Sequence, residues 1–220
     1  MNQNLAPQPK PNATLLLLTA WAIALVGYFG PWLGRPSAAL AWNAYDLFDL
    51  LRLLPEIEAG ALIVNLQALR LPLVGLAVLL PMMLANARLP SRLTAALLGI
   101  GLALTTLPSY PEIVRAWRLP GWRVPFWWGV GAMVGAVAAV WLAPRLGATR
   151  PWLCLAWTAL TGIPATITLY RLIPALSRLH GAQIAPAWGF WTCAGGMFII
   201  ALVAWGQSIR KIKEVSNVRE

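Results

Sequence analysis

Six stretches of this 220-residue chain are almost entirely apolar and carry no charged or histidine side chain in their interiors. Each has close to the roughly 20 residues that an α-helix needs to cross the hydrocarbon core of a bilayer. The stretches cover residues 13–33, 71–87, 93–110, 126–143, 152–170 and 188–206. They predict an all-α, polytopic membrane helical bundle of about six transmembrane helices, formed by residues 13–206 between an N-terminal tail (1–12) and a basic C-terminal tail (207–220).

The overall composition points to the same class of protein. Hydrophobic residues make up 59% of the chain and charged residues 11%, whereas soluble domains average roughly 45–50% and 25%. Lys and Arg exceed Asp and Glu by 17 to 7, which gives a formal net charge of +10. These basic residues are scattered singly between apolar runs, so they favour contact with lipid phosphates over nucleic-acid binding.

The connections between the apolar stretches alternate in length, which places the short turns on one side of the membrane. The two sides of the membrane have similar totals of basic residues, so the totals do not decide the orientation. The basic residues are densest in the short turns and after residue 206, which favours a cytoplasmic location for that side. We therefore expect a cell-membrane protein with both termini cytoplasmic. The first stretch is longer than the apolar part of a typical signal peptide, which favours an uncleaved helix over a secretory signal ending near Ala39-Leu40-Ala41.

Residues 34–70 form the longest outer segment, and part of it is amphipathic. Residues 43–60 predict a helix on the outer surface, which either Asn43 or Asp46 caps at its start. Asp49, Arg52 and Glu56 follow one another at intervals of three and four, so they share one face, can pair with each other and form a candidate outer interaction site.

Two later outer segments also predict short helices, one opened by a Ser109 to Glu112 capping box and one near Pro174. Pro111 and Pro174 each precede a short stretch with an Arg and then a Gly, and Pro55 lies between Arg52 and Gly60. This pattern suggests a loose threefold repeat of about 60 residues, although proline-rich boundaries alone would produce it.

Aromatic side chains gather on the predicted outer side of the bundle. A girdle at the headgroup level explains them most simply, and the alternative is an outer pocket for a lipid, quinone or pigment. The tryptophans concerned are Trp32, Trp42, Trp117, Trp122, Trp127, Trp128, Trp188 and Trp191.

Small residues mark candidate helix contacts. Gly131 and Gly135 in the fourth stretch, and Gly195 and Gly196 in the sixth, would allow helix backbones to approach closely. Gly162 and Pro164 lie among threonines in the fifth stretch, where a proline frees a carbonyl and threonine hydroxyls can compensate. We interpret this site as a structural kink, or alternatively as a hinge or a break that lines a substrate site.

Residues suited to catalysis or to a bound metal are scarce, so we expect no enzyme activity, cofactor or metal. His180 is the only histidine, and Cys154 and Cys193 lie near opposite ends of their helices. The carboxylates of Asp46, Asp49, Glu56 and Glu58 could together bind a calcium ion. The simpler explanation is that they form the solvated face of an amphipathic helix.

Two functions remain. The first is a non-enzymatic structural or accessory membrane subunit, whose partners are the lipid bilayer and either another membrane protein or further copies of itself. The second is a carrier or binder of an uncharged or lipid-like ligand, which needs no charged site. A continuous cavity between the fifth stretch and its neighbours, opening under the helix predicted over residues 43–60, would favour the second function.

Overall fold

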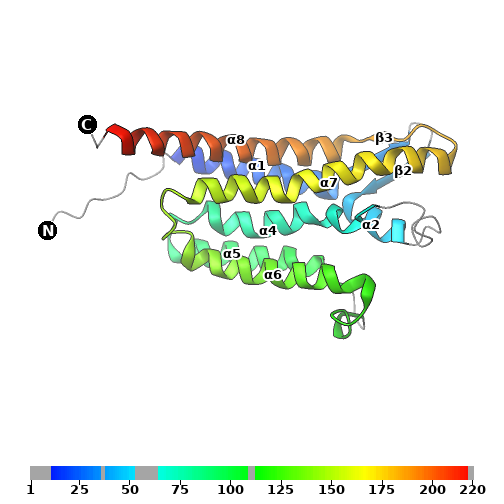
Figure 1. Cartoon of the computed structure of the whole chain (residues 1–220), viewed down its shortest axis with the longest axis horizontal. Helices are drawn as coiled ribbons and strands as arrows, with labels where there is room; N and C mark the ends of the chain where they lie inside the picture. The colour runs from blue at the N-terminus through cyan, green and yellow to red at the C-terminus, as the bar shows by residue number, and fades with distance from the viewer. Residues whose placement is uncertain (1–10, 36–37, 53–63, 109–111, 218–220) are drawn as a thin grey trace.

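Six long helices lie side by side in this computed structural model, which describes residues 11–35, 38–52, 64–108 and 112–217 (Figure 1). The helices are α1 (Pro11–Phe29), α4 (Leu71–Met83), α5 (Leu89–Thr105), α6 (Pro120–Leu142), α7 (Arg150–His180) and α8 (Trp188–Asn217). The bundle has a terminal end, where α1 begins and α8 ends, and a sheet end, where its three strands lie. The turns at residues 84–88 and 143–149 lie at the terminal end.

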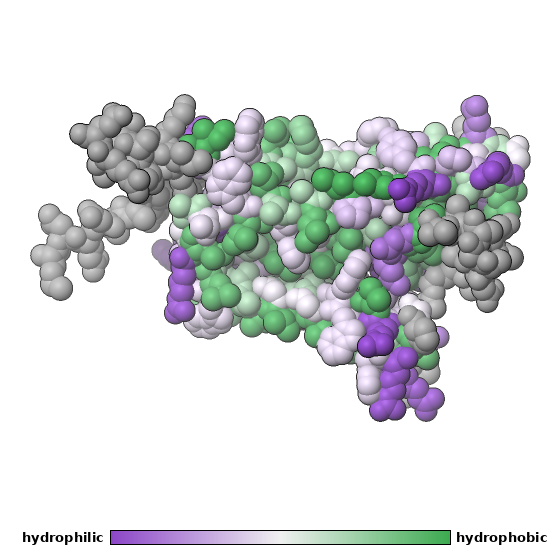
Figure 2. Space-filling model, in the orientation of Figure 1, coloured by the Kyte–Doolittle hydropathy of each residue, from purple (hydrophilic) through white to green (hydrophobic). Residues whose placement is uncertain are grey.

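Four helical segments are long and apolar enough to cross a membrane, namely Leu66–Met83, Gly121–Leu142, Arg150–His180 and Trp188–Arg210. The first of them joins a 3₁₀ turn, η1 (Leu66–Arg70), to α4. Two further apolar helices, Ala13–Phe29 and Leu89–Thr105, are shorter. Hydrophobic side chains dominate the middle of the bundle, whereas hydrophilic ones gather towards its two ends (Figure 2). These features support a helical membrane bundle.

Helix α4 is the central helix of the bundle. It packs against α1, α5, α6 and α7, and all of its residues except Leu71 are buried. Pro81 lies inside α4 and has no N–H to donate to the carbonyl of Ala77, four residues earlier. Gly99 of α5 faces that carbonyl so closely that an added Cβ would meet it. The absence of a side chain at Gly99 therefore lets α5 approach α4 at the point where Pro81 frees a carbonyl.

Helices α1 and α8 pack closely through small residues. An added Cβ at Gly27 would meet the backbone nitrogen of Cys193, and one at Gly196 would lie 2.6 Å from the backbone nitrogen of Ala24. Gly30 and Gly189 face each other in the same way at the sheet end. Such close contact strengthens the van der Waals attraction between the two helices. This attraction matters in lipid because the hydrophobic effect does not drive helix association there.

A small sheet at one end corrects the all-α prediction. Strand β1 (Pro31–Arg35) pairs antiparallel with β2 (Ala38–Asn43) on one side and with β3 (Ala185–Pro186) on the other. The prediction that the first helix extends to residue 33 was therefore wrong, because α1 ends at Phe29. Pro31 lacks an N–H and disfavours helical backbone at the residue before it, so the chain leaves the helix and becomes extended.

Other helix boundaries also differ from the predicted ones. Helix α7 continues past residue 170, through Pro174, to His180, and α8 continues past residue 206 to Asn217. Gly181 ends α7 in the left-handed conformation, with φ of 57°. The prediction of a separate short helix around Pro174 was wrong, because this left-handed cap, and not the loss of hydropathy at Arg171, ends the helix.

The outer amphipathic helix is present as α2 (Ala44–Arg52). The Asn43 side chain accepts a hydrogen bond from the Asp46 N–H at 2.7 Å, so Asn43 is the cap at its start. Pro55, Glu56, Glu58 and Gly60 lie outside the described residues. Of the second outer segment, the structure describes a short 3₁₀ turn, η2 (Glu112–Val114), while Ser109 and Pro111 lie outside the described residues.

Candidate functional site

A pocket of about 360 Å³ lies between α7 and α8. Its floor includes Pro72 of α4, and Trp32 of β1 and Phe190 of α8 close it towards the sheet end. The remaining lining residues are Thr158, Ala159, Gly162, Ile163, Ala165, Thr166, Ile167, Cys193, Ala194, Met197, Phe198 and Ala201.

The pocket opens on the side of the bundle. Ile163 and Ile167 of α7 and Phe198 of α8 line it and are also exposed on the outer surface. Gly162 and alanines on both helices leave the space between them unfilled, and an added Cβ at Gly162 would lie 3.7 Å from the terminal methyl of Met197. In a bilayer this opening would face the lipid chains.

The threonine hydroxyls and the indole N–H around the pocket already have partners within the protein. The hydroxyl of Thr158 donates to the Cys154 carbonyl at 2.7 Å, and that of Thr166 donates to the Gly162 carbonyl at 3.1 Å. The indole N–H of Trp32 donates to the Gly27 carbonyl at 3.1 Å. A ligand in this pocket would therefore meet an apolar wall, and a polar group placed there would lose its hydrogen bonds to water without replacement.

Buried aromatic rings support the closed end of the pocket. Trp32 packs edge to face with Phe190 at a centroid distance of 5.6 Å and with Tyr28 at 5.9 Å. The Tyr28 hydroxyl is fully buried and has no hydrogen-bond partner among the residues that the structure describes. The rings of α1, β1 and α8 thus form one packed wall between the pocket and the sheet end.

A buried arginine forms a second centre at the sheet end. Arg70, at the junction of η1 and α4, is only 2% exposed. Its guanidinium donates to the Thr106 carbonyl at the end of α5 at 2.5 Å and to Asp49 of α2 at 3.1 Å. A charge removed from water needs such partners, because desolvation disfavours the charged state.

Aromatic rings surround the same guanidinium. Its central carbon lies 3.8 Å from the ring centroid of Phe48, 5.1 Å from that of Trp122 and 5.4 Å from that of Tyr45. The negative face of an aromatic ring attracts a cation, and the attraction increases when the cation is desolvated. Arg70 therefore holds α2, α4, α5 and α6 together at the sheet end.

The role of Arg70 was not predicted from the sequence. The charge pattern predicts that Arg70 is one of several basic residues that reach lipid phosphates from the membrane boundary, whereas the structure buries it inside the protein. The available signal was the arrangement of Tyr45, Phe48 and Asp49 within one turn of α2, which presents two rings and a carboxylate to a single cation. Nothing in the sequence shows which arginine they meet.

The outer candidate residues are only partly described. Asp49 pairs with Arg70, 21 residues away in the chain. Arg52 is the last residue of α2, and Glu56 lies outside the described residues. The structure thus connects Asp49 to the bundle and leaves the pairing of Arg52 with Glu56 as a prediction.

The four candidate packing glycines occupy different environments. An added Cβ at Gly135 would lie 3.2 Å from a methyl of Val78, and Gly196 faces α1. Gly131 and Gly195 have open space within 4 Å of the same position. On α6 it is instead Ala132, Ala136 and Ala139 that are buried, because they share the helix face that packs against α4 and α5.

The remaining candidate residues are the hinge pair Gly162 and Pro164, His180 and the two cysteines. Helix α7 continues through Pro164, and Gly162 lines the pocket. His180 packs against Trp42 at a centroid distance of 5.5 Å, and both cysteines are free and buried. Within the described ranges, no group of three or more His, Cys, Asp and Glu residues could hold a metal ion.

The pocket and the buried arginine are suited to binding apolar groups and to holding the helices together, respectively. The pocket presents an apolar wall with satisfied donors, and the buried cation is held by the protein's own groups. No family model, curated protein or solved structure matches the chain.

Proposed function

We propose that this protein is a six-pass cell-membrane protein that binds an uncharged, lipid-like molecule in the pocket between α7 and α8. The observation that carries the proposal is an apolar pocket that is open at the side of the bundle and whose lining donors are already satisfied. Such a wall favours hydrocarbon over a polar ring or headgroup, because hydrocarbon has no hydrogen bonds to lose on entry. The ligand's polar end would then remain outside the pocket.

The six crossings rest on the arrangement of the helices. Helices α1 and α5 are short, but α1 packs along the longer α8, and α5 packs along the longer α6 and along α4, which η1 extends to the 18-residue segment Leu66–Met83. Following the chain, the six helices run alternately towards the sheet end and towards the terminal end (Figure 1). Large apolar side chains also remain exposed along the bundle, among them Leu97, Val134 and Phe198, which suits contact with lipid.

The orientation follows from the basic residues at the terminal end. The turns there contain Arg88 and Arg145, both exposed, and Arg210 lies near the end of α8. We propose that this end faces the cytoplasm, because basic residues in short loops are enriched on that side. Both termini would then be cytoplasmic.

The alternative function is that of a structural or accessory subunit. The open space beside Gly131 favours it, because a helix of another protein or of a second copy could approach α6 closely there. Extraction in a mild detergent followed by size-exclusion chromatography would test it, since a monomer without copurified protein would contradict this alternative.

Native mass spectrometry of the protein extracted in mild detergent tests ligand binding. Gly162→Leu projects a side chain from α7 into the pocket towards Met197. Gly131→Leu is the matched control, since it adds the same side chain to an open face of α6. We expect the wild type and Gly131→Leu to retain the same lipid adduct, and Gly162→Leu to lose about tenfold in affinity for it, which corresponds to about 1.4 kcal/mol.

Equal adducts on all three proteins, or no adduct on the wild type, would contradict the proposal. The thermal unfolding of Gly162→Leu, measured in the same detergent, serves as the folding control. A variant that unfolds at the wild-type temperature but loses the adduct has lost binding and not structure.

A further inference from the structure

Residues 112–119 project to the side of the bundle beneath α6, near the sheet end (Figure 1). Residues 112–123, which we call the basic loop, begin with η2 and continue through turns into the first residues of α6. Backbone hydrogen bonds define its shape, including Arg115 N–H to the Glu112 carbonyl at 3.0 Å and Arg118 N–H to the Arg115 carbonyl at 2.9 Å. Within it, Ala116 is buried.

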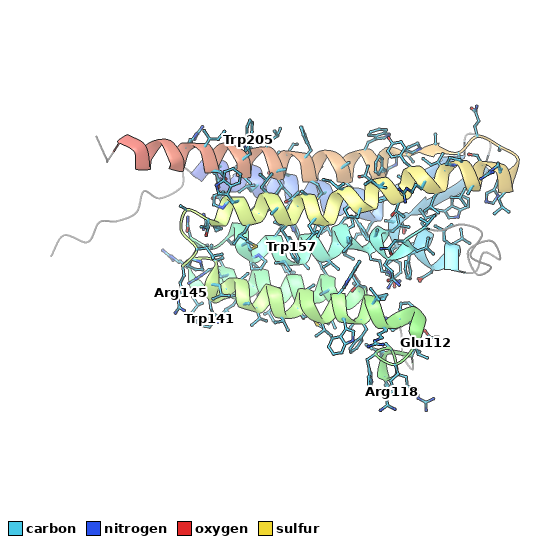
Figure 3. The ribbon with its side chains drawn as sticks, viewed as in Figure 1. Glu112, Arg118, Trp141, Arg145, Trp157 and Trp205 are labelled. Atoms are coloured by element: carbon cyan, nitrogen blue, oxygen red, sulfur yellow. The ribbon has the colours of Figure 1, made fainter. Side chains whose placement is uncertain are left out.

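The basic loop concentrates exposed positive charge. Arg115, Arg118 and Arg123 are all exposed, and Glu112 is the only acidic residue in the segment. Among the described residues, none of these three arginines forms a salt bridge with a carboxylate. Figure 3 labels Arg118 and Glu112 on this projection, where the side chains extend away from the helices.

Exposed apolar groups alternate with these arginines. Val114, Trp117 and Leu119 are exposed, and the guanidinium carbon of Arg118 lies 4.1 Å from the ring centroid of Trp117. An indole ring with a polar N–H and an apolar body favours the boundary between headgroups and hydrocarbon. Arginine binds phosphate through several N–H donors in a planar arrangement.

The terminal end does not offer the same combination. There, Arg92 donates to the Val140 carbonyl at 2.9 Å and Arg150 donates to the Asn86 side chain at 2.9 Å, so both are engaged within the protein. The exposed arginines Arg88, Arg145 and Arg210 are distributed over two turns and α8. Only the basic loop, within the described part of the chain, combines three exposed arginines with exposed apolar side chains in one short segment.

We infer that the basic loop is a binding site for the headgroups of anionic phospholipids. The three arginines contact the lipid phosphates, while Val114, Trp117 and Leu119 enter the boundary region beside them. Each basic residue near a membrane surface strengthens attraction to anionic lipid, and the attraction falls off within a Debye length. This site is separate from the pocket between α7 and α8, and its binding does not depend on whether that pocket takes a ligand.

Lipid titration of the full-length protein in mild detergent, followed by native mass spectrometry, tests this inference. The probes are dioleoyl phosphatidylglycerol and dioleoyl phosphatidylcholine, which share their acyl chains and differ in charge. One variant combines Arg115→Gln, Arg118→Gln and Arg123→Gln. The matched control combines Arg88→Gln, Arg145→Gln and Arg210→Gln, which removes the same charge from exposed sites at the terminal end.

We expect the wild type and the control to prefer phosphatidylglycerol equally, and the basic-loop variant to lose about tenfold or more of that preference. An unchanged preference in the basic-loop variant would overturn the inference. So would an equal loss in the control variant, because the preference would then follow from net charge alone. Size-exclusion chromatography and thermal unfolding of both variants show whether they remain folded.

Discussion

Asp49 Oδ1 lies 3.1 Å from Nη2 of Arg70, and this contact joins the short outer helix α2 to the start of the central helix α4. The two side chains differ in burial, because Asp49 is 47% exposed and Arg70 is 2% exposed. Arg70 is therefore the desolvated partner, and Asp49 supplies its carboxylate from the surface. The pair joins α2 to the bundle at the sheet end together with Leu47, Phe48 and Leu51 of α2, which are buried.

Substitution of Arg70 should destabilise the protein more than substitution of Asp49. We expect Asp49→Asn to lower the free energy of unfolding by about 1 kcal/mol, because solvent screens the half-exposed carboxylate. Arg70→Gln should cost about 3 kcal/mol, since it also removes the hydrogen bond to the Thr106 carbonyl and the contact with Phe48. Thermal unfolding in detergent measures both, and the double variant gives the coupling between them. Equal losses in the two single variants would contradict this account of Arg70.

The contact between α1 and α8 should not tolerate a methyl group at Gly27. An added Cβ would meet the backbone of Cys193 and would lie 2.8 Å from the Gly189 carbonyl oxygen, and these backbone atoms cannot turn away. We expect Gly27→Ala to reduce stability by about 2 kcal/mol or more. Gly101→Ala is the control, since open space surrounds that position and alanine favours a helix. The yield of folded protein and its unfolding temperature distinguish the two, and a stable Gly27→Ala protein would show that the helices lie farther apart.

Removal of the Tyr28 hydroxyl should not reduce stability. This group is buried and has no hydrogen-bond partner among the described residues, so Tyr28→Phe removes a polar atom that gains nothing from burial. We expect unchanged stability or a gain of about 1 kcal/mol. Trp32→Phe should instead lose about 1 kcal/mol, because the indole N–H donates to the Gly27 carbonyl. The free energies of unfolding of the two variants, measured under identical conditions, test this difference. A Tyr28→Phe protein less stable than the wild type would indicate that the hydroxyl has a partner.

The apolar stretches predicted the helical bundle because hydropathy is a local property. A run without charged residues can be recognised from adjacent residues alone, and each of the six stretches overlaps one of the helices α1, α4, α5, α6, α7 and α8. The ends of those helices were less predictable. Pro31 and Gly181 set them through backbone conformation. Strand β1 pairs with the adjacent β2, and also with β3, about 150 positions away in the chain.

The pocket and the buried arginine depend on tertiary structure. Gly162 occurs in the sequence as one small residue among several, and it lines a pocket only because α8 places Met197 and Ala194 opposite it. Arg70 resembles the other basic residues at the membrane boundary until α2, α5 and α6 supply Asp49, the Thr106 carbonyl and Trp122 around it.

The sequence alone therefore determined that the chain forms apolar helices with charged residues near their ends, because the cost of removing charge from water acts on each segment separately. Tertiary structure decided which charge is buried and where the helices leave space. Those outcomes depend on partners from distant segments, and such partners come together only when the chain has folded.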